Sequence, residues 1–143
     1  MSESKAIVNY PWNTIDDLVK VIAGRVSTFN PTHIVGITRG GLIPAVMLSH
    51  SFDLPMETLG VSFRDNRATH HTKFKPIDDA RYLIVDDIND SGTTFKVVTD
   101  IFKNRRLQHR TAALINKEKS YFNVDFYGEM FYHDDWINFP WEK

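Results

Sequence analysis

The sequence contains no cysteine. This absence excludes disulfide bonds, catalysis by a thiolate and zinc sites with cysteine ligands. An excess of one charge sign is also missing, because the formal net charge of the 143 residues is −1. So small a net charge gives no electrostatic sign of a protein that binds nucleic acid or a membrane surface. We expect neither partner.

Long hydrophobic runs are missing too, and none approaches the ~20 residues that a membrane-spanning helix needs. The first residues, MSESKAIVNYPW, lack the basic start and apolar core of a signal peptide, so we expect a cytoplasmic protein. The chain shows no repeat and no linker rich in proline, glycine or serine. Hydrophobic residues make up 42% and charged residues 24%, which suits a single folded domain over residues 1–143.

Segments with the periodicity of strands alternate with helical ones. The predicted helices cover residues 11–29, 42–52 and 93–104, and the predicted strands cover residues 33–37, 56–63, 81–87, 110–116 and 124–132. In the first helix, Thr14 and Asp17 have the spacing of a capping box. This alternation predicts an α/β fold with a mainly parallel, buried sheet flanked by helices. Ligands of such sheets bind at the carboxyl ends of the strands.

One of these strands leads into the most informative stretch of the sequence, YLIVDDINDSGTTF, Tyr82 to Phe95. Residues Ser91 to Thr94 lie between a predicted strand and a predicted helix. N–H groups at the start of a helix bind anions, and a glycine lets the backbone approach them closely. The segment therefore suits a terminal monophosphate. It is not a Walker A loop, because no lysine follows the glycine in the required place.

Two carboxylates, Asp86 and Asp87, precede this loop and would repel a phosphate unless their charge were offset. Mg²⁺ would offset it, ribose hydroxyls would donate hydrogen bonds to the carboxylates, and both solutions are compatible. Asp90 lies between the acid pair and the hydroxyl residues, where it could exchange a proton with a base nitrogen. Phosphate, ribose and base in this order describe a nucleoside monophosphate. The alternative is an acidic strand-to-helix loop with a good helix cap.

This order of residues resembles the type I phosphoribosyltransferases, which bind 5-phosphoribosyl 1-pyrophosphate (PRPP). The resemblance implies that Asp86 and Asp87 contact the ribose hydroxyls and Mg²⁺, and that Asp90 faces the base. It also implies that the 5'-phosphate is held by Ser91, Gly92, Thr93 and Thr94. The segment GITRGG is similar to the pyrophosphate loop of the family, which gives that role to Arg39, Gly40 and Gly41. Taken alone, RGG would be an ordinary turn.

Two further stretches are similar to the purine-specific members. Lys117 follows a strand at the place where a lysine of those enzymes donates to the 6-oxo group, although a lone lysine there is otherwise solvated. HDDWINFPWEK is similar to the hood of the bacterial xanthine-guanine enzymes, formed here from parts of residues 1–12 and 117–143. Trp136 and Ile137 would cover the purine. The alternative is that Trp136 and Trp141 only pack the C-terminal segment.

The resemblance implies transfer of 5-phosphoribosyl from PRPP to guanine, xanthine or hypoxanthine in purine salvage, with Mg²⁺ as cofactor and Asp90 and Arg39 as catalytic residues. It also implies a homodimer or homotetramer. Residues 64–76 are polar and basic, so we expect a mobile loop there. This loop takes the place of the catalytic flexible loop of the family, and its cations Arg64, Arg67 and Lys73 are candidates to neutralise pyrophosphate. His70 and His71 more often occur as solvated loop residues than as metal ligands.

Three alternatives to this activity remain open. The first is an enzyme for adenine or a pyrimidine, which Lys117 and the hood disfavour. The second is a regulator that binds PRPP or a nucleotide, which usually needs a basic face or an added DNA-binding segment. The third is an inactive paralogue, which is disfavoured because every acidic position of the motif is filled.

Overall fold

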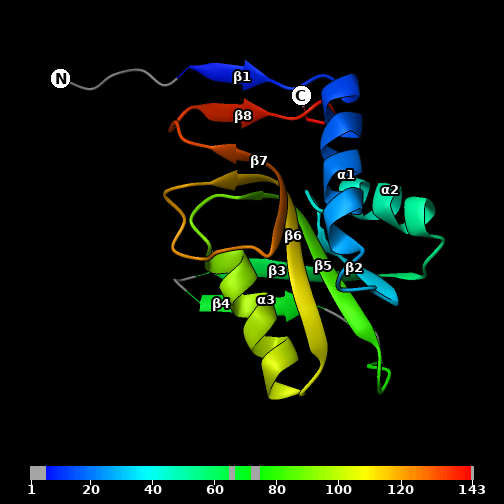
Figure 1. The fold of residues 1–143 in the computed structure, drawn as a ribbon. Coiled ribbons are helices and arrows are strands. Elements are labelled where there is room, and N and C mark those ends of the chain that lie inside the picture. Colours follow the sequence, from blue (N-terminus) through cyan, green and yellow to red (C-terminus); the bar gives the residue numbers. More distant parts are fainter. Residues whose placement is uncertain (1–5, 65–66, 72–74, 143) are drawn as a thin grey trace.

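The central sheet has five parallel strands and one antiparallel strand at its edge. Its order is β4-β3-β2-β5-β6-β7 in a computed structural model that describes residues 6–64, 67–71 and 75–142 (Figure 1). The strands are β2 (His33–Thr38), β3 (Met56–Arg64), β4 (Arg67–His71), β5 (Arg81–Asn89), β6 (Gln108–Lys117) and β7 (Phe126–Phe131). The predicted α/β fold is confirmed, and every strand predicted from the sequence is present.

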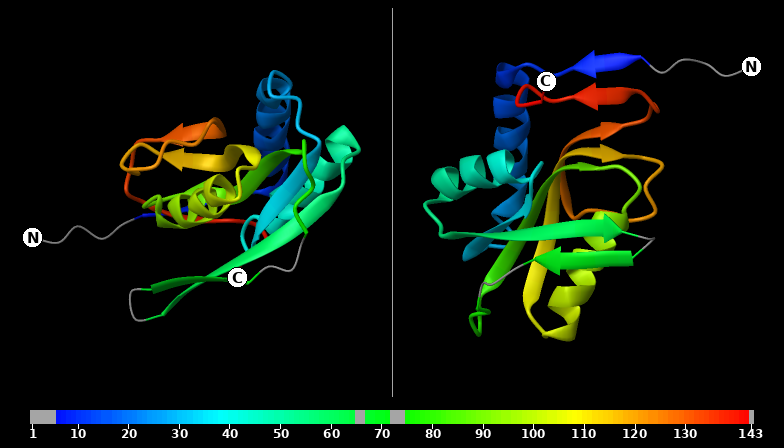
Figure 2. Two further views of the ribbon diagram at one scale, coloured as in Figure 1. Left: turned by 90° about the horizontal axis from the view of Figure 1, so that it is seen from below. Right: turned by 180° about the vertical axis from the view of Figure 1, so that it is seen from behind.

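Helices cover both faces of this sheet, as Figures 1 and 2 show: α1 (Trp12–Val26) and α2 (Leu42–Phe52) lie on one face and α3 (Thr93–Asn104) on the other. Alternate residues of β5 divide between two hydrophobic cores because successive strand side chains point to opposite faces. Leu83 and Val85 join the core under α1 and α2. Tyr82 and Ile84 join the core under α3. This two-sided burial explains why the strand sequence is uniformly apolar.

The helix bounds predicted for α2 and α3 are those observed. The capping box predicted in α1 is wrong, since the cap residue is Pro11 and no side chain caps the helix. Thr14 lies inside the first turn, where its N–H donates to Pro11 O at 3.1 Å and to Asn13 Oδ1 at 2.9 Å. No helix among the described residues is long and apolar enough to cross a membrane.

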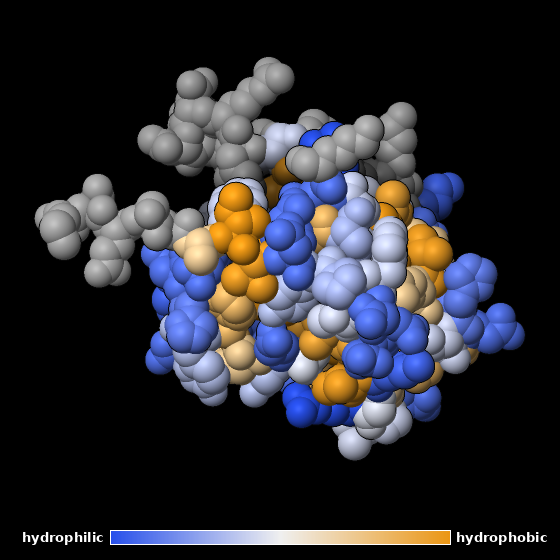
Figure 3. All heavy atoms as spheres, turned by 90° about the horizontal axis from the view of Figure 1, so that it is seen from above, coloured by the Kyte–Doolittle hydropathy of each residue, from blue (hydrophilic) through white to orange (hydrophobic). Residues whose placement is uncertain are grey.

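A second, two-stranded sheet joins the two ends of the chain. Here β1 (Ile7–Asn9) and β8 (Trp136–Asn138) pair in parallel, with Ile7 opposite Trp136 and Val8 opposite Ile137. The sequence analysis predicts neither strand, because three residues are too few to show a period. Seen from the side of this small sheet, the surface mixes apolar and polar side chains (Figure 3). Ile7 and Trp136 are 67% and 60% exposed there.

The expectation of a loop over residues 64–76 is wrong for much of this segment. β3 continues to Arg64, and β4 pairs with it in antiparallel register, with Gly60 opposite His71 and Arg64 opposite Arg67. His70 also lies in β4, whereas Lys73 falls outside the described residues. The polar sequence does not reveal β4, because pairing at a sheet edge satisfies the backbone without an apolar face. Figure 2 shows the paired strands at the edge of the sheet.

Candidate functional site

The carboxyl ends of β2, β5 and β6 meet at one edge of the sheet, and the predicted site residues gather there. A cleft of about 740 Å³ is lined by residues from all parts of the chain, among them Thr38, Arg39, Gly40, Asp86, Asp87, Thr94, Trp141 and Glu142. A second hollow of about 160 Å³ adjoins it and is lined by Asp86, Ile88, Asn89, Asp90, Ser91, Gly92, Thr94 and Phe95. The two share Asp86 and Thr94 and so form one continuous site.

Asp86 and Asp87 form a half-buried acid pair at the end of β5. The N–H of Asp87 donates to Asp86 Oδ1 at 2.8 Å. Burial raises the pKa of Asp86 well above its usual value, and the negative charge of Asp87 raises it further. Burial likewise raises the pKa of Asp87, with a smaller contribution from the charge of Glu142. The pair therefore needs a cation or several hydrogen-bond donors before both carboxyls ionise readily.

The loop after β2 packs tightly against this acid pair. A Cβ added to Gly40 would lie 2.3 Å from Asp87 Oδ2, and one added to Gly41 would lie 2.3 Å from the carbonyl oxygen of Val85. Neither position has room for a side chain. The peptide bond between Thr38 and Arg39 is cis. The Arg39 side chain is exposed at the cleft, so its guanidinium is available to an anion.

The segment Ser91 to Thr94 turns from β5 into α3 as the sequence predicts. Gly92 is the cap residue with φ of 101°, a conformation that glycine adopts without strain. The hydroxyls of Ser91 and Thr93 are exposed and lie 3.1 Å apart, and the Thr93 N–H donates to Ser91 Oγ at 3.3 Å. Hydroxyl and backbone donors thus meet at the N-terminus of a twelve-residue helix, where an anion is stabilised.

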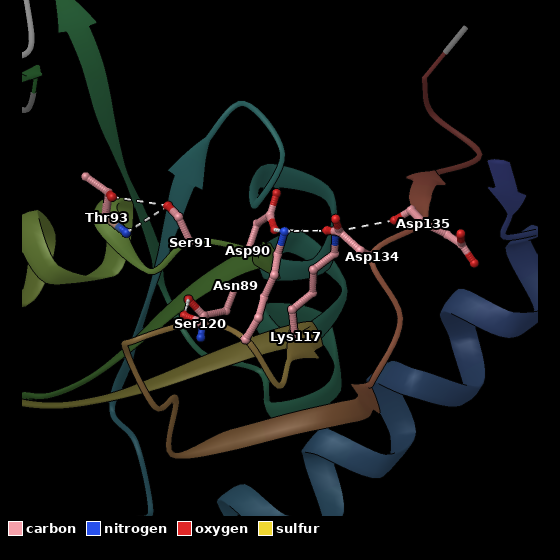
Figure 4. A network of polar contacts seen from close by, with 9 residues as sticks. Asn89, Asp90, Ser91, Thr93, Lys117, Ser120, Asp134 and Asp135 are labelled. Carbon is pink, nitrogen blue, oxygen red and sulfur yellow. Dashed lines mark hydrogen bonds and ion pairs between the residues drawn. The ribbon is translucent and has the colours of Figure 1, made fainter. Parts of the chain in front are cut away.

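Asp90 lies between this segment and two lysines from the end of β6. Its Oδ1 is 3.4 Å from Lys117 Nζ and 3.5 Å from Lys119 Nζ. Lys117 also donates to the carbonyl oxygen of Asp135 at 3.3 Å, and Lys119 pairs with Asp134 at 2.5 Å. In Figure 4, Thr93, Ser91, Asp90 and Asp134 follow one another from the start of α3 toward β8, with Lys117 reaching up to Asp90.

The residues predicted for the hood differ from one another in burial. Trp136 is 60% exposed and follows Asp135, whose carbonyl oxygen accepts from Lys117. Ile137 is 5% exposed and packs into the core under α1, so its side chain supports the strand from behind. Trp141 stacks on Phe139 at 4.9 Å, which fits the packing alternative for this residue. Among the residues that the structure describes, Trp136 has no stacked ring partner.

Comparison with known proteins gives a family. The model of the phosphoribosyl transferase domain matches residues 11–142. The chain belongs to the phosphoribosyltransferase family. A xanthine-guanine phosphoribosyltransferase of Gluconobacter oxydans is 30% identical, over 99% of this chain and 89% of that protein. One from Cereibacter sphaeroides is 29% identical, over 92% and 84%. The crystal structure of a purine phosphoribosyltransferase from Pyrococcus horikoshii is 32% identical, with a TM-score of 0.89 over 96% of this chain and 95% of that one.

The acid pair offers the carboxylate oxygens that a hard cation prefers. Mg²⁺ usually takes one or two carboxylates and completes its shell with water and substrate phosphates. The raised pKa values of Asp86 and Asp87 reflect burial and neighbouring negative charge, which a divalent ion would offset. Among the residues described, no three carboxylate or histidine groups are placed to hold a metal together. A bound ion would therefore draw its remaining ligands from the substrate.

Four residues at the site were not predicted to contact a ligand. Trp141 and Glu142 line the main cleft from the C-terminal segment. The sequence gives one signal for Glu142, because an acid after Pro-Trp belongs to the hood pattern. Tyr121 contacts Thr93 at the helix start, and no motif marks it. Asn89 lies inside the central motif, which assigns it no role, and it donates to the carbonyl oxygen of Phe122.

Proposed function

We propose that this protein is a 6-oxopurine phosphoribosyltransferase, which transfers 5-phosphoribosyl from PRPP to guanine, xanthine or hypoxanthine in purine salvage. The observation that carries the proposal is the pairing of Asp90 with Lys117 at 3.4 Å. This pair places the carboxylate of Asp90, a hydrogen-bond acceptor, beside the ammonium group of Lys117, a hydrogen-bond donor. A 6-oxopurine offers an acceptor at O6 and a proton at N7 to such a pair, whereas adenine offers a second donor at its 6-amino group.

The geometry of the cleft supports the remaining contacts of this proposal. The helix start over Ser91 to Thr94 holds the 5'-phosphate, and Asp86 and Asp87 accept hydrogen bonds from the ribose hydroxyls. Arg39 and the backbone of Gly40 and Gly41 bind the pyrophosphate group. Trp136 stacks on the purine. Ile137 contributes through the backbone of β8, since its side chain lies in the core.

In the reaction, N9 of the base forms a bond to C1 of the ribose as the bond from C1 to the pyrophosphate oxygen breaks. Pyrophosphate leaves with the electron pair of that bond, and the ribose ring carries cationic character in between. Asp90 accepts the proton that N7 releases. Arg39 stabilises the charge that develops on pyrophosphate. Mg²⁺, held by Asp86 and Asp87, would supply further positive charge for the leaving group when bound.

The test is an assay of pyrophosphate release with PRPP, Mg²⁺ and one base at a time. We expect release with at least one of guanine, xanthine and hypoxanthine and none with adenine. Lys117→Met should lower kcat/KM for the 6-oxopurine at least tenfold. Lys103→Met, at an exposed position near the end of α3, is the matched control.

Other outcomes would overturn parts of the proposal. Activity with adenine or a pyrimidine alone would contradict the role of Lys117. Tight binding of PRPP without reaction of any base would favour a regulator that binds PRPP or a nucleotide.

A further inference from the structure

The loop of residues 118–122 packs directly against the segment that holds the 5'-phosphate in the proposed function. The Tyr121 N–H donates to the carbonyl oxygen of Ser91 at 3.3 Å. A Cβ added to Gly92 would lie 2.8 Å from both Ser120 Oγ and the Cβ of Phe122, so no space separates the two segments. This loop therefore forms one wall of the hydroxyl-lined segment.

A buried network of amide and hydroxyl groups fixes that wall. Asn89, which is 1% exposed, donates to Asn116 Oδ1 at 2.8 Å and to the carbonyl oxygen of Phe122 at 2.7 Å. Ser120 Oγ donates to Asn89 Oδ1 at 3.1 Å. Buried polar networks whose members are satisfied make the surrounding backbone rigid. Asn89 precedes Asp90 in the chain, so the network fixes the position of the wall relative to the backbone of Asp90.

Tyr121 is the residue that this wall presents to solvent. Its side chain is 63% exposed, so burial explains little of why a large aromatic ring lies there. In the described part of the chain, its hydroxyl donates to Thr93 Oγ1 at 3.4 Å. Thr93 Oγ1 is in turn 3.1 Å from Ser91 Oγ. Three hydroxyl groups from two segments thus meet at the start of α3.

We propose that Tyr121 is a further phosphate-binding residue, whose hydroxyl donates a hydrogen bond to the terminal phosphate of the ribose 5-phosphate group. The inference rests on the proposed function. In the free protein the three hydroxyls satisfy one another at long distances of 3.1 to 3.4 Å. A phosphate carries several oxygen acceptors and stronger negative charge, so it would turn all three toward itself. The N–H of Tyr121 is held by the carbonyl oxygen of Ser91, which fixes the tyrosine backbone beside the helix start.

Direct binding of ribose 5-phosphate, measured by isothermal titration calorimetry, tests this role without requiring activity. A hydrogen bond to a charged group contributes enough that its loss weakens binding by about tenfold. We expect the Kd of Tyr121→Phe to rise by about tenfold relative to the unmodified protein. Tyr132→Phe is the matched control, because that tyrosine is 71% exposed and has no place in the site. Its Kd should not change.

Steady-state kinetics gives a second readout. With Tyr121→Phe the KM for PRPP should rise while the KM for the base stays constant, which general damage to the fold would not produce. An unchanged Kd in Tyr121→Phe would overturn the role of Tyr121 and leave the proposed function intact. If the unmodified protein does not bind ribose 5-phosphate at all, the assignment of the phosphate site itself fails and the role of Tyr121 fails with it.

Discussion

Lys117 Nζ lies 3.4 Å from Oδ1 of Asp90, in an ion pair whose lysine side chain is 6% exposed and whose aspartate side chain is 50% exposed. The lysine is thus fixed in the protein while the carboxylate faces the solvent-filled site. An exposed ion pair contributes little to stability. A half-exposed acid beside a buried cation is instead suited to exchange its partner for a ligand, which is the behaviour that the proposed base-binding role requires.

Asp90→Asn should lower kcat by a factor of about 10² to 10⁴, since the variant cannot accept a proton from the base. Asparagine keeps the shape and still offers an oxygen to Lys117, so the Kd for PRPP should change by less than about threefold. Single-turnover kinetics and calorimetry measure the two quantities. Asp100→Asn, which alters only a surface pair with Lys96, is the control. An unchanged kcat in Asp90→Asn would remove this residue from the mechanism.

Trp136→Ala should raise the KM for the base by about tenfold or more, because stacking of an aromatic side chain on a base contributes about 1–3 kcal/mol. The melting temperature should move little, since 60% of the residue is already exposed. Steady-state kinetics at saturating PRPP and thermal unfolding measure the two effects. Tyr132→Ala is an exposed aromatic control. If the KM for the base is the same in both variants, Trp136 does not cover the purine.

Gly40→Ala should disturb the acid pair, because the added Cβ would lie 2.3 Å from Asp87 Oδ2. We expect kcat/KM for PRPP to fall at least tenfold as the carboxylate is displaced. The same change at Gly24, in helix α1, meets no atom within 4 Å. Gly24→Ala should therefore keep full activity and stabilise the protein by about 1 kcal/mol. Equal activity of the two variants would show that the contact between Gly40 and Asp87 is unimportant.

The acid pair also predicts how stability depends on pH in the presence of a chelator. Since burial raises the pKa of Asp86, the folded chain keeps this proton at pH values where the unfolded chain has released it. At about pH 3 and below, both states hold the proton and the carboxyl has no effect. Stability is then lost as the pH rises from about 4 through the folded pKa.

Asp86→Asn removes that loss and retains an oxygen for the Asp87 N–H. The variant should unfold at higher urea concentration than the unmodified protein at pH 7, and the difference should vanish at about pH 3. Urea titrations at the two pH values measure this. Asp78→Asn, at an exposed position, should show no such dependence. A difference of the same size at the low pH and at the high pH would exclude titration of the acid pair as the cause.

The fold was largely predictable because its strands are buried on both faces. The adjacent residues Leu83 and Ile84 belong to different cores, and both are apolar. A run of adjacent apolar residues predicts a buried strand and is not typical of a surface loop. The bounds of α3 follow from Gly92, whose positive φ separates the strand from the helix. The residues of the central motif also gather at one edge, as the carboxyl ends of parallel strands require.

Other features depend on tertiary contacts that a sequence does not show. β4 and β8 form because their backbones pair with neighbouring strands. They therefore do not need an alternation of apolar and polar residues, which is the pattern by which a strand is predicted. Tyr121 is identified only by its contacts, since a single tyrosine in a loop has no distinguishing neighbours in the sequence. Ile137 and Trp136 are adjacent and both apolar, and only the pairing of β8 with β1 decides which one faces the core.

The pairing of β1 with β8 sets the order in which this protein can be completed during synthesis. The N–H of Ala6 donates to Asp135 Oδ1 across a separation of 129 residues. Residues 136–138 must have left the ribosome before β1 has a partner, while the strands up to β6 and the start of α3 are available earlier. A chain interrupted before Trp136 would possess the turn from β5 into α3 and lack the small sheet. Translation would thus leave β1 without its partner strand until residues 136–138 have been made.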